Sequence, residues 1–387
     1  ETLFSSVSSI LNIRGLYGQV TTNFGQPILL NDILNEHCTN WKTLAYDDSY
    51  RPDWLRPAVE HTSNLIMQRI NESCSVNATS LIATALLASP NQTMDEGELI
   101  RTVGFYIDLI EGLDYSDNIS LAPYKALSQI HHVEALGLVR RRKHEMGDFI
   151  YLDNAHAVLM TYYRNNILHL LAIPSLIACC FLNSAALSQH KIYYYIKLAY
   201  PFLRTEFFLP WNDIELEKVV NKLLHTFSSK DLLAYNKASG VYTRARISTD
   251  GHAQLNNLAH IISPLLELYY MIFALLAEHG SNKLSHERLE ELCHLMAQRL
   301  SLMYEINSPD FFDRKLISNF INSLIQQDYV RINETGRLEL SNYALNEGRQ
   351  ARRLLDKNMQ YNILQMLRTT SDKHQTTRNK SHDAGKH

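Results

Sequence analysis

The hydrophobic pattern of the chain is dominated by one apolar run near its middle, residues 159–182. Asp153 or Asn154 can cap a helix that begins near Ala155, because such side chains accept hydrogen bonds from the first free N–H groups of a helix. From there the large apolar side chains recur at helical spacing. Pro174 cannot continue the hydrogen-bond ladder, so we expect a kink or a second helix there. The run therefore predicts helix that is buried on most sides.

A second pattern, helices followed by two short strands, occurs three times after residue 90. The apolar spacing changes from helical to alternating each time, which predicts a hairpin behind the helices. Such an arrangement resembles winged-helix modules, although no fixed sequence period indicates true repeats. Residues 31–90 are also expected to be helical. The later helices are predicted over 95–112, 124–136, 214–227, 289–303 and 316–325, and the strands at 138–140, 149–152, around Gly240 and within 329–340.

The two ends of the chain differ from its helical middle. Alternating positions from 18 to 24 predict a strand, which a turn at residues 23–27 closes. From Arg349 onward nine Lys or Arg stand against three Asp, and residues 369–387 have no apolar side chains to bury, which predicts disorder. The expected organisation is the edge of another domain over 1–30, a helical domain over 31–345, and a basic, partly disordered tail over 346–387.

Composition narrows the class of protein. A chain of 387 residues with 45% hydrophobic residues is typical of one large or two to three smaller globular domains. The net charge of −3 gives no general attraction to nucleic acid. The odd number of cysteines, five, indicates a reducing compartment. The chain opens on Glu1 without an initiator Met or a signal peptide, which we interpret as a fragment.

One polar cluster interrupts the central apolar segment. Tyr162, Asn165, Asn166 and His169 are spaced by three, four and seven residues, so they are predicted to share a helix face, and Arg164 lies among them. These five residues either support a ligand pocket from behind or form a buried hydrogen-bond network that fixes the helix. We favour the network, and we assign no catalytic residue.

Other candidate chemistry is weaker. The adjacent pairs at 131–132, 179–180 and 293–294 lack the spacing of zinc ligands, so no metal and no cofactor is expected. The compact basic run from Arg140 to Lys143 allows an alternative function, a winged-helix nucleic-acid-binding regulator. Because the whole chain is slightly acidic, we expect this run to meet solvent, another part of the protein or anionic headgroups instead. Two apolar runs, 167–187 and 262–277, contain polar or charged residues and are predicted to be buried rather than membrane-spanning.

Several separated motifs carry a resemblance to a known family. Tyr162-Tyr163-Arg164-Asn165-Asn166, His169 and Pro174-Ser175-Leu176 resemble a signature of bacterial membrane-bound glycerol-3-phosphate acyltransferases of the PlsB type. Further matching stretches occur in the same order and spacing, and together they cover roughly residues 11–329, the C-terminal half of such an enzyme. These stretches are 18–20 with Asn23-Phe24-Gly25-Gln26-Pro27, Arg51-Pro52 with Trp54-Leu55, 84–89 and 297–301.

The resemblance implies a fold and an activity. The fold would be a mainly α C-terminal region with small winged-helix-like hairpins, and its first strand would belong to an α/β acyltransferase domain. The activity would be transfer of an acyl group from acyl-CoA or acyl-carrier protein to the 1-hydroxyl of sn-glycerol 3-phosphate, the first step of phospholipid synthesis. The protein would lie on an anionic membrane surface, as a peripheral protein at the cytoplasmic face of the cell inner membrane.

The catalytic motif of this family does not occur in the chain. The family uses a His and an Asp separated by four residues, and no His here has an Asp five positions later. The nearest approach is His144 with Asp148, and the family's Phe-x-Glu-Gly-x-Arg-Ser phosphate-binding stretch is also absent. We therefore expect the substrates to bind through a missing catalytic half and the chain to be inactive alone. A helical scaffold without an enzymatic role is the third hypothesis.

Overall fold

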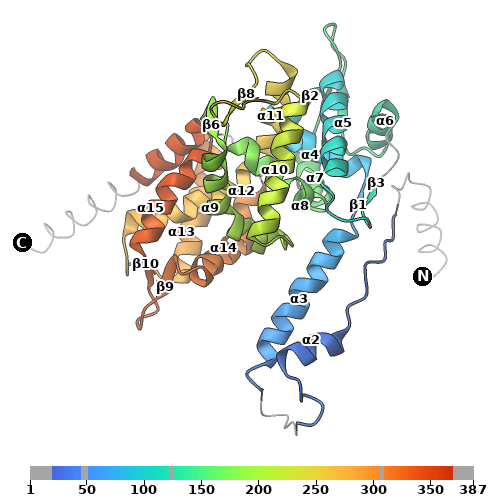
Figure 1. Cartoon of the computed structure of the whole chain (residues 1–387). Helices are drawn as coiled ribbons and strands as arrows, with labels where there is room; N and C mark the ends of the chain where they lie inside the picture. The colour runs from blue at the N-terminus through green and yellow to red at the C-terminus, as the bar shows by residue number, and fades with distance from the viewer. Residues whose placement is uncertain (1–19, 45–50, 122–125, 305–308, 369–387) are drawn as a thin grey trace, which may run out of the picture. The chain divides into compact units, whose positions relative to one another are not determined.

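Long helices alternate with very short strands along the described chain. The computed structural model describes residues 20–44, 51–121, 126–304 and 309–368 (Figure 1). The chain divides into two compact units, with unit 1 ending at Leu170 and unit 2 beginning at Leu171. The mainly α fold with small β hairpins is confirmed. The division at Leu170 was not predicted, because the longest apolar run of the sequence crosses it.

Unit 1 contains two small sheets among its helices. Two of its strands, β1 and β3, form a parallel pair, and β2, β5 and β4 form an antiparallel sheet in that order. The elements are α2 (Leu30–His37), α3 (Leu55–Glu72), β1 (Ser75–Val76), α4 (Ala78–Leu87), η1 (Pro90–Gln92), β2 (Thr93–Asp95), α5 (Glu96–Gly112), β3 (Ser120–Leu121), α6 (Ala126–Ala135), β4 (Arg140–Arg142), β5 (Phe149–Tyr151) and α7 (Asn154–Asn165).

Unit 2 begins within α8 (Leu168–Cys179) and contains two further small sheets. Strands β6, β8 and β7 form an antiparallel sheet in that order, and β9 pairs with β10. The elements are β6 (Ala186–Ser188), α9 (Gln189–Phe207), α10 (Asp213–Ser229), β7 (Leu233–Asn236), β8 (Val241–Arg244), α11 (Asp250–His260), α12 (Ser263–His279), α13 (His286–Tyr304), η2 (Pro309–Phe312), α14 (Arg314–Gln326), β9 (Val330–Ile332), β10 (Leu338–Leu340), α15 (Asn342–Ala351) and η3 (Arg352–Leu354). Residues 357–368 are also helical.

One order of elements recurs three times: helix, strand, two helices, two strands and a final helix. The first copy runs from α4 to α7, the second from α8 to α11, and the third from α12 to α15. In the third copy, hydrogen bonds from Asn282 N to Leu338 O and from Leu338 N to Leu284 O place residues 282–284 beside β10, as β2 lies beside β5. The three hairpins predicted from the sequence are therefore parts of one repeated module.

The first strand of each copy escaped prediction. β2 and β6 have three residues each, which is too short for an alternating pattern to stand out. Each strand is nevertheless followed by a helix whose first turn is capped by a polar side chain, Asp95 for α5 and Ser188 for α9. A short strand and a polar cap thus mark the start of the second helix in the first two modules.

The predicted strand from 18 to 24 is wrong for its described part. Residues 20–29 have no regular secondary structure, and residues 18 and 19 lie outside the described residues. Val20 and Phe24 are 94% and 90% exposed, so no neighbouring strand covers them in the described chain. A strand needs a partner for its backbone hydrogen bonds, and alternation of side chains alone does not supply one. The assignment of residues 1–30 to an α/β domain stays a prediction.

The central segment breaks earlier than predicted. Asp153 caps α7 by accepting from the N–H of His156, as expected, but α7 ends at Asn165 and α8 begins at Leu168. Pro174 lies inside α8 and neither kinks the chain into two helices nor starts one. The break falls instead at two consecutive asparagines, whose side chains compete with helical hydrogen bonds. Because of this break, the candidate residues before and after it lie on two different helices.

The tail is shorter than predicted. The proposed boundary between residues 345 and 346 falls inside α15, and residues 357–368 form a further helix of unit 2. Leu354, Leu355, Ile363 and Met366 are buried, which accounts for the apolar stripe that the sequence shows there. The predicted disordered stretch, residues 369–387, lies outside the described residues.

Among the described residues, no single helix is long and apolar enough to cross a membrane. α11 and α12 meet the length and composition criteria only together, and they are bent by 49° at their junction. The residues of α12 from Leu265 to Leu276 are buried within unit 2.

Candidate functional site

Two motifs that lie far apart in the sequence meet at the C-terminal end of α3. The last carbonyl groups of a helix have no partner within the helix and must find donors elsewhere. His169 Nε2 donates to the carbonyl of Asn71 at 3.1 Å, and Asn23 Nδ2 donates to the carbonyl of Ser73 at 2.8 Å. Asn23 Nδ2 also lies 3.0 Å from the hydroxyl of Ser120. Both motif residues therefore fix the end of this helix.

Gly25 allows the N-terminal segment to lie directly against α3. A Cβ atom at this position would come within 2.8 Å of Ser73 Oγ and 3.3 Å of the Arg69 carbonyl oxygen. Both distances are shorter than ordinary van der Waals contact, and the second neighbour is backbone that cannot rotate away. A larger residue would have to displace the Ser73 hydroxyl and shift the α3 backbone slightly, which gives a physical reason for the glycine of the Asn-Phe-Gly-Gln-Pro motif.

An open groove of about 700 Å³ lies beside this contact, within the size range of ligand-binding clefts. Its lining mixes side-chain amides with the apolar side chains of α3. Asn165 and Asn166, two of the five candidate residues, contribute to it. The other lining residues are Thr21, Asn23, Gly25, Gln26, Ile28, Ile66, Met67, Arg69, Ile70, Asn71, Ser73, Cys74, Ser75 and Asn77.

His169 is buried and is not a general base. Burial lowers its pKa to about 4, although the hydrogen bond to Asn71 opposes the shift. The imidazole is therefore neutral at pH 7 and carries its proton on Nε2, where it donates to the carbonyl. Its ring lies edge-on to Tyr115, with 5.3 Å between the ring centroids. The side chain acts as a hydrogen-bond donor within the core, in accord with the structural interpretation.

The five candidates do not share one face. Tyr162 is 68% exposed and Asn165 and Asn166 are exposed, whereas Arg164 and His169 are buried. Arg164 donates from Nε and Nη2 to the side-chain oxygen of Asn165, at 3.1 and 2.9 Å. The single buried network predicted from their spacing is wrong, because the break between α7 and α8 turns Asn165 and Asn166 toward the groove and His169 toward α3.

The groove is suited to binding rather than to bond-breaking. Its amides can donate to and accept from a polar group or a polypeptide backbone, and the guanidinium of Arg69, which pairs with Glu72 at 2.6 Å, can donate to one. Burial raises the pKa of the Cys74 thiol to about 12, so this sulfur is not a thiolate nucleophile at neutral pH. Within the described lining, no nucleophile is paired with a base.

Arg141 lies at the centre of an ion-pair cluster that sequence reasoning missed. Its guanidinium contacts Glu96 at 2.7 Å, Asp148 at 3.0 Å and Glu134 at 3.2 Å, and its side chain is only 15% exposed. The hydrogen bond to Glu96 above all raises the pKa of the guanidinium, so it stays charged. Arg141 therefore joins β4 to α5 and α6 and does not belong to a free basic run.

His144 and Asp148, the nearest approach to a catalytic pair, have separate roles. Asp148 accepts from Arg141 at 3.0 Å, whereas His144 Nδ1 accepts from the N–H of Met146 at 3.1 Å within the turn. The imidazole also lies edge-on to Phe149. Both residues stabilise the hairpin.

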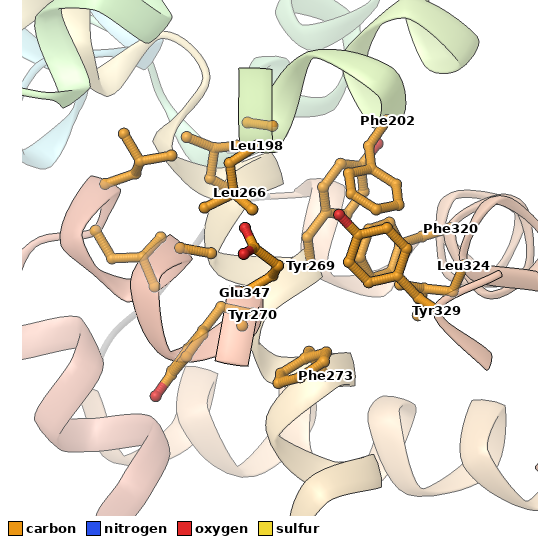
Figure 2. A pocket seen from close by; sticks show the side chains of 15 residues that line it. Leu198, Phe202, Leu266, Tyr269, Tyr270, Phe273, Phe320, Leu324, Tyr329 and Glu347 are labelled. Carbon is orange, nitrogen blue, oxygen red and sulfur yellow. The ribbon is translucent and has the colours of Figure 1, made fainter. Parts of the chain in front are cut away.

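Unit 2 holds an apolar pocket that the sequence did not reveal (Figure 2). Phe202, Tyr269, Phe320 and Tyr329 gather on one side of it, and Glu347 lies among apolar side chains on the other. The ring of Tyr269 stacks on that of Phe320, with 3.9 Å between centroids. At about 70 Å³ the pocket is far below the usual size of a ligand site, so we interpret it as a gap in the module core.

Glu267 of unit 2 is a buried acid with a strongly raised pKa. It is buried in α12, and burial raises its pKa to about 8, with a smaller contribution from the charge of Asp356. The carboxyl group is therefore largely protonated at pH 7. In the described part of the chain, no group of three or more His, Cys, Asp or Glu side chains could hold a metal ion.

Comparisons with known proteins agree with the motifs. The family described as "Glycerol-3-phosphate acyltransferase C-terminal region" matches residues 1–333. The chain is similar to the glycerol-3-phosphate acyltransferase of Pseudomonas savastanoi pv. phaseolicola, with 35% identity over 98% of this chain and 45% of the relative. The enzyme of the same name from Pseudomonas fluorescens SBW25 is 34% identical over 95% of this chain and 44% of its own length.

A third relative named glycerol-3-phosphate acyltransferase, from Ectopseudomonas mendocina, is 36% identical over 87% of this chain and 41% of its own length. The chain thus spans less than half the length of the relatives that it matches. None of these names points to a nucleic-acid-binding regulator, so the alternative function has no support. The match over 333 of 387 residues shows that the chain belongs to the family of glycerol-3-phosphate acyltransferase C-terminal regions.

Proposed function

We propose that this chain works as part of an enzyme that transfers an acyl group from acyl-CoA or acyl-carrier protein to the 1-hydroxyl of sn-glycerol 3-phosphate. The observation that carries the proposal is the 35% identity, over 98% of the chain, to a protein named glycerol-3-phosphate acyltransferase. The product, 1-acylglycerol 3-phosphate, is a precursor of phospholipids, which connects the chain to lipid metabolism.

The chemistry of this reaction assigns a supporting role to the region. Acyl transfer to a hydroxyl needs a base for the attacking oxygen, donors for the developing oxyanion and cations for the phosphate. The imidazole of His169 is neutral and its Nε2 donates a hydrogen bond to the carbonyl of Asn71, so it does not supply a base. The thiol of Cys74 is protonated, so it does not supply a nucleophile. The region would support acyl transfer that is carried out by groups outside the described residues.

We also propose peripheral attachment to the cytoplasmic face of the inner membrane. An anionic surface attracts exposed Lys and Arg with about 1 kcal/mol each, and salt screens the attraction. Arg142 and Lys143 are exposed and available for such contacts, whereas Arg141 is held by three carboxylates. Release of most of the protein from membranes by high salt or alkaline carbonate is the expected result. Retention through both washes would contradict peripheral attachment.

The catalytic proposal is tested by an assay of the purified chain with acyl-CoA and labelled glycerol 3-phosphate, beside the complete enzyme of Pseudomonas savastanoi. We expect product from the complete enzyme and none above a heat-killed control from this chain. A chimera in which this chain replaces the matching region of the relative should regain turnover. Turnover by the chain alone that a His169→Ala substitution abolishes would overturn the supporting role, and an inactive but folded chimera would count against the shared function.

A further inference from the structure

Helix α3 exposes an apolar face that nothing in the described chain covers. Of its eighteen residues only Ala58 is buried. Val59, Ile66 and Ile70 are 54%, 45% and 57% exposed. At about 100° per residue these three side chains fall within roughly 40° of one another and extend for about 17 Å along the helix. We call this strip of Val59, Ile66 and Ile70 the α3 seam.

The α3 seam continues into the groove. Ile66 and Ile70 contribute to the groove lining, and the segment from Thr21 to Ile28 forms the opposite wall. Phe24 of that segment is almost fully exposed, and Leu29 and Leu30 are more than half exposed. Exposed apolar side chains that gather in one place indicate an interaction surface, whereas isolated ones do not. The seam and the groove thus form one continuous surface of unit 1.

The repeated modules indicate on which side the partner lies. α7 and α11 directly precede α8 and α12, the first helices of the next two modules, and α3 precedes α4, the first helix of the first module, with only β1 between them. α7 packs on α4, and α11 accepts a hydrogen bond from Ser175 of α8 at the Leu258 carbonyl, so each packs on the first helix of the module that it ends. α3 has a corresponding place in the order, but in the described residues the short helix α2 is the only helix before it.

We infer that the α3 seam is the docking surface for the part of the acyltransferase that precedes this region in its relatives. The inference rests on the proposed function. The relatives are more than twice as long as the matched stretch, and the family is described as a C-terminal region, so they carry such a part. A protein face with complementary apolar side chains covers the seam, and the amides of the groove pair with its polar edge.

The charges on α3 favour a protein over a lipid surface. Helices that lie on membranes carry an excess of Lys and Arg beside the apolar face. On α3, Arg56 pairs with Glu60 at 3.0 Å and Arg69 pairs with Glu72 at 2.6 Å, so each cation is matched by an anion. The seam is also narrow and is interrupted by Ser63, which is typical of a helix packed against another helix.

The test measures whether the seam is covered when the preceding part is present. Ile66→Cys and Ile70→Cys are made in the isolated chain and in a fusion with the part of the Pseudomonas savastanoi relative that precedes the matched region. Maleimide labelling rates are read peptide by peptide with mass spectrometry. Asn64→Cys is the matched control, because Asn64 is exposed on the same helix but points about 120° away from the seam.

In the fusion we expect labelling at positions 66 and 70 to slow by about tenfold or more, because interface cores exclude solvent, while the control stays within about twofold. The buried Cys293 reports folding and must stay unlabelled. If the fusion exposes Cys293, the two parts are co-expressed as separate chains and labelled in the same way. Labelling needs no turnover, so a protected seam in an inactive fusion would count against the proposed function but not against this inference.

Three outcomes would overturn the inference. Equal labelling rates in the folded isolated chain and in the folded fusion or co-expressed pair would show that the preceding part does not cover the seam. Slow labelling of the seam in the isolated chain, together with a dimeric mass that the Ile66→Asp substitution abolishes, would assign the seam to a second copy. Protection that requires vesicles of anionic phospholipid would assign it to the membrane surface.

Discussion

His169 shows at the residue scale how a motif residue can hold two parts of the fold together. Replacing it with Ala removes the donor to the Asn71 carbonyl and the packing against Tyr115. We expect a loss of about 2–3 kcal/mol in the free energy of unfolding, measured by chemical denaturation of the chain. Asn166→Ala is the control, because Asn166 is exposed in the groove and should change stability by less than about 0.5 kcal/mol. Equal losses from both substitutions would contradict this assignment.

Glu267 gives a prediction for the pH dependence of stability. Its pKa is about 8 in the folded state against 4.5 in the unfolded chain, so unfolding releases a proton between these pH values. Stability therefore falls as the pH rises from 4.5 to 8, by up to about 5 kcal/mol at 1.36 kcal/mol per pKa unit. Glu267→Gln should melt near the wild-type temperature at pH 5 and well above it at pH 8. Parallel melting curves across this range would argue against a buried neutral acid.

Spacing selected the candidate residues of the central motif but did not predict the directions of their side chains. Tyr162, Asn165, Asn166 and His169 share a face only if one straight helix carries them all. The two asparagines end α7 instead, and this local competition between side chain and backbone is not visible in a periodicity argument. The partner of His169, the carbonyl of Asn71, lies 98 residues away in sequence and could not be predicted without the fold.

At the scale of elements, Arg141 holds the β4–β5 hairpin against two helices. Arg141→Ala would leave Glu96, Glu134 and Asp148 close together without their shared cation. Breaking such a partly buried pair costs about 2–4 kcal/mol, which should appear as a lower melting temperature and early hydrogen exchange in β4 and β5. Arg142→Ala is the matched control on the same strand, since Arg142 is exposed, and it should have little effect. Similar destabilisation by both substitutions would show that the cluster contributes nothing specific.

Helices were predicted more reliably than strands for a physical reason. The expected helix over 95–112 matches α5, and the expected helix over 214–227 falls within α10, because each has a polar cap and a long apolar stripe. The first strands of the modules have three residues and gain their stability from neighbours rather than from their own sequence. The segment from 18 to 24 is the opposite case. Its side chains alternate between apolar and polar, but its described part has no neighbouring strand and forms no sheet.

At the scale of the whole chain, three modules with one order of elements arise from sequences without a visible period. Each module needs only an apolar first helix, a capped second helix and a hairpin whose inner face is buried, and many sequences meet these conditions. The packing of α4 with α7, of α8 with α11 and of α12 with α15 recurs, although different residues make it. The modules therefore share a pattern of buried positions and not a set of identical residues. For this reason a search for repeated residues along the sequence does not detect them.

The end of unit 2 leads to a prediction for truncated chains. Leu354, Leu355, Ile363 and Met366 are each at most 3% exposed, and each contributes about 1.5–3 kcal/mol through burial. Ending the chain after residue 345 removes all four and cuts α15, a loss comparable with the total stability of about 5–15 kcal/mol of a typical domain. We expect that truncation to unfold unit 2 and to expose Cys293 to labelling. Ending the chain after residue 368 should leave the melting temperature unchanged, since residues 369–387 contain no large apolar side chain. A folded, cooperatively melting protein that ends at residue 345 would instead support the domain boundary inferred from charge alone.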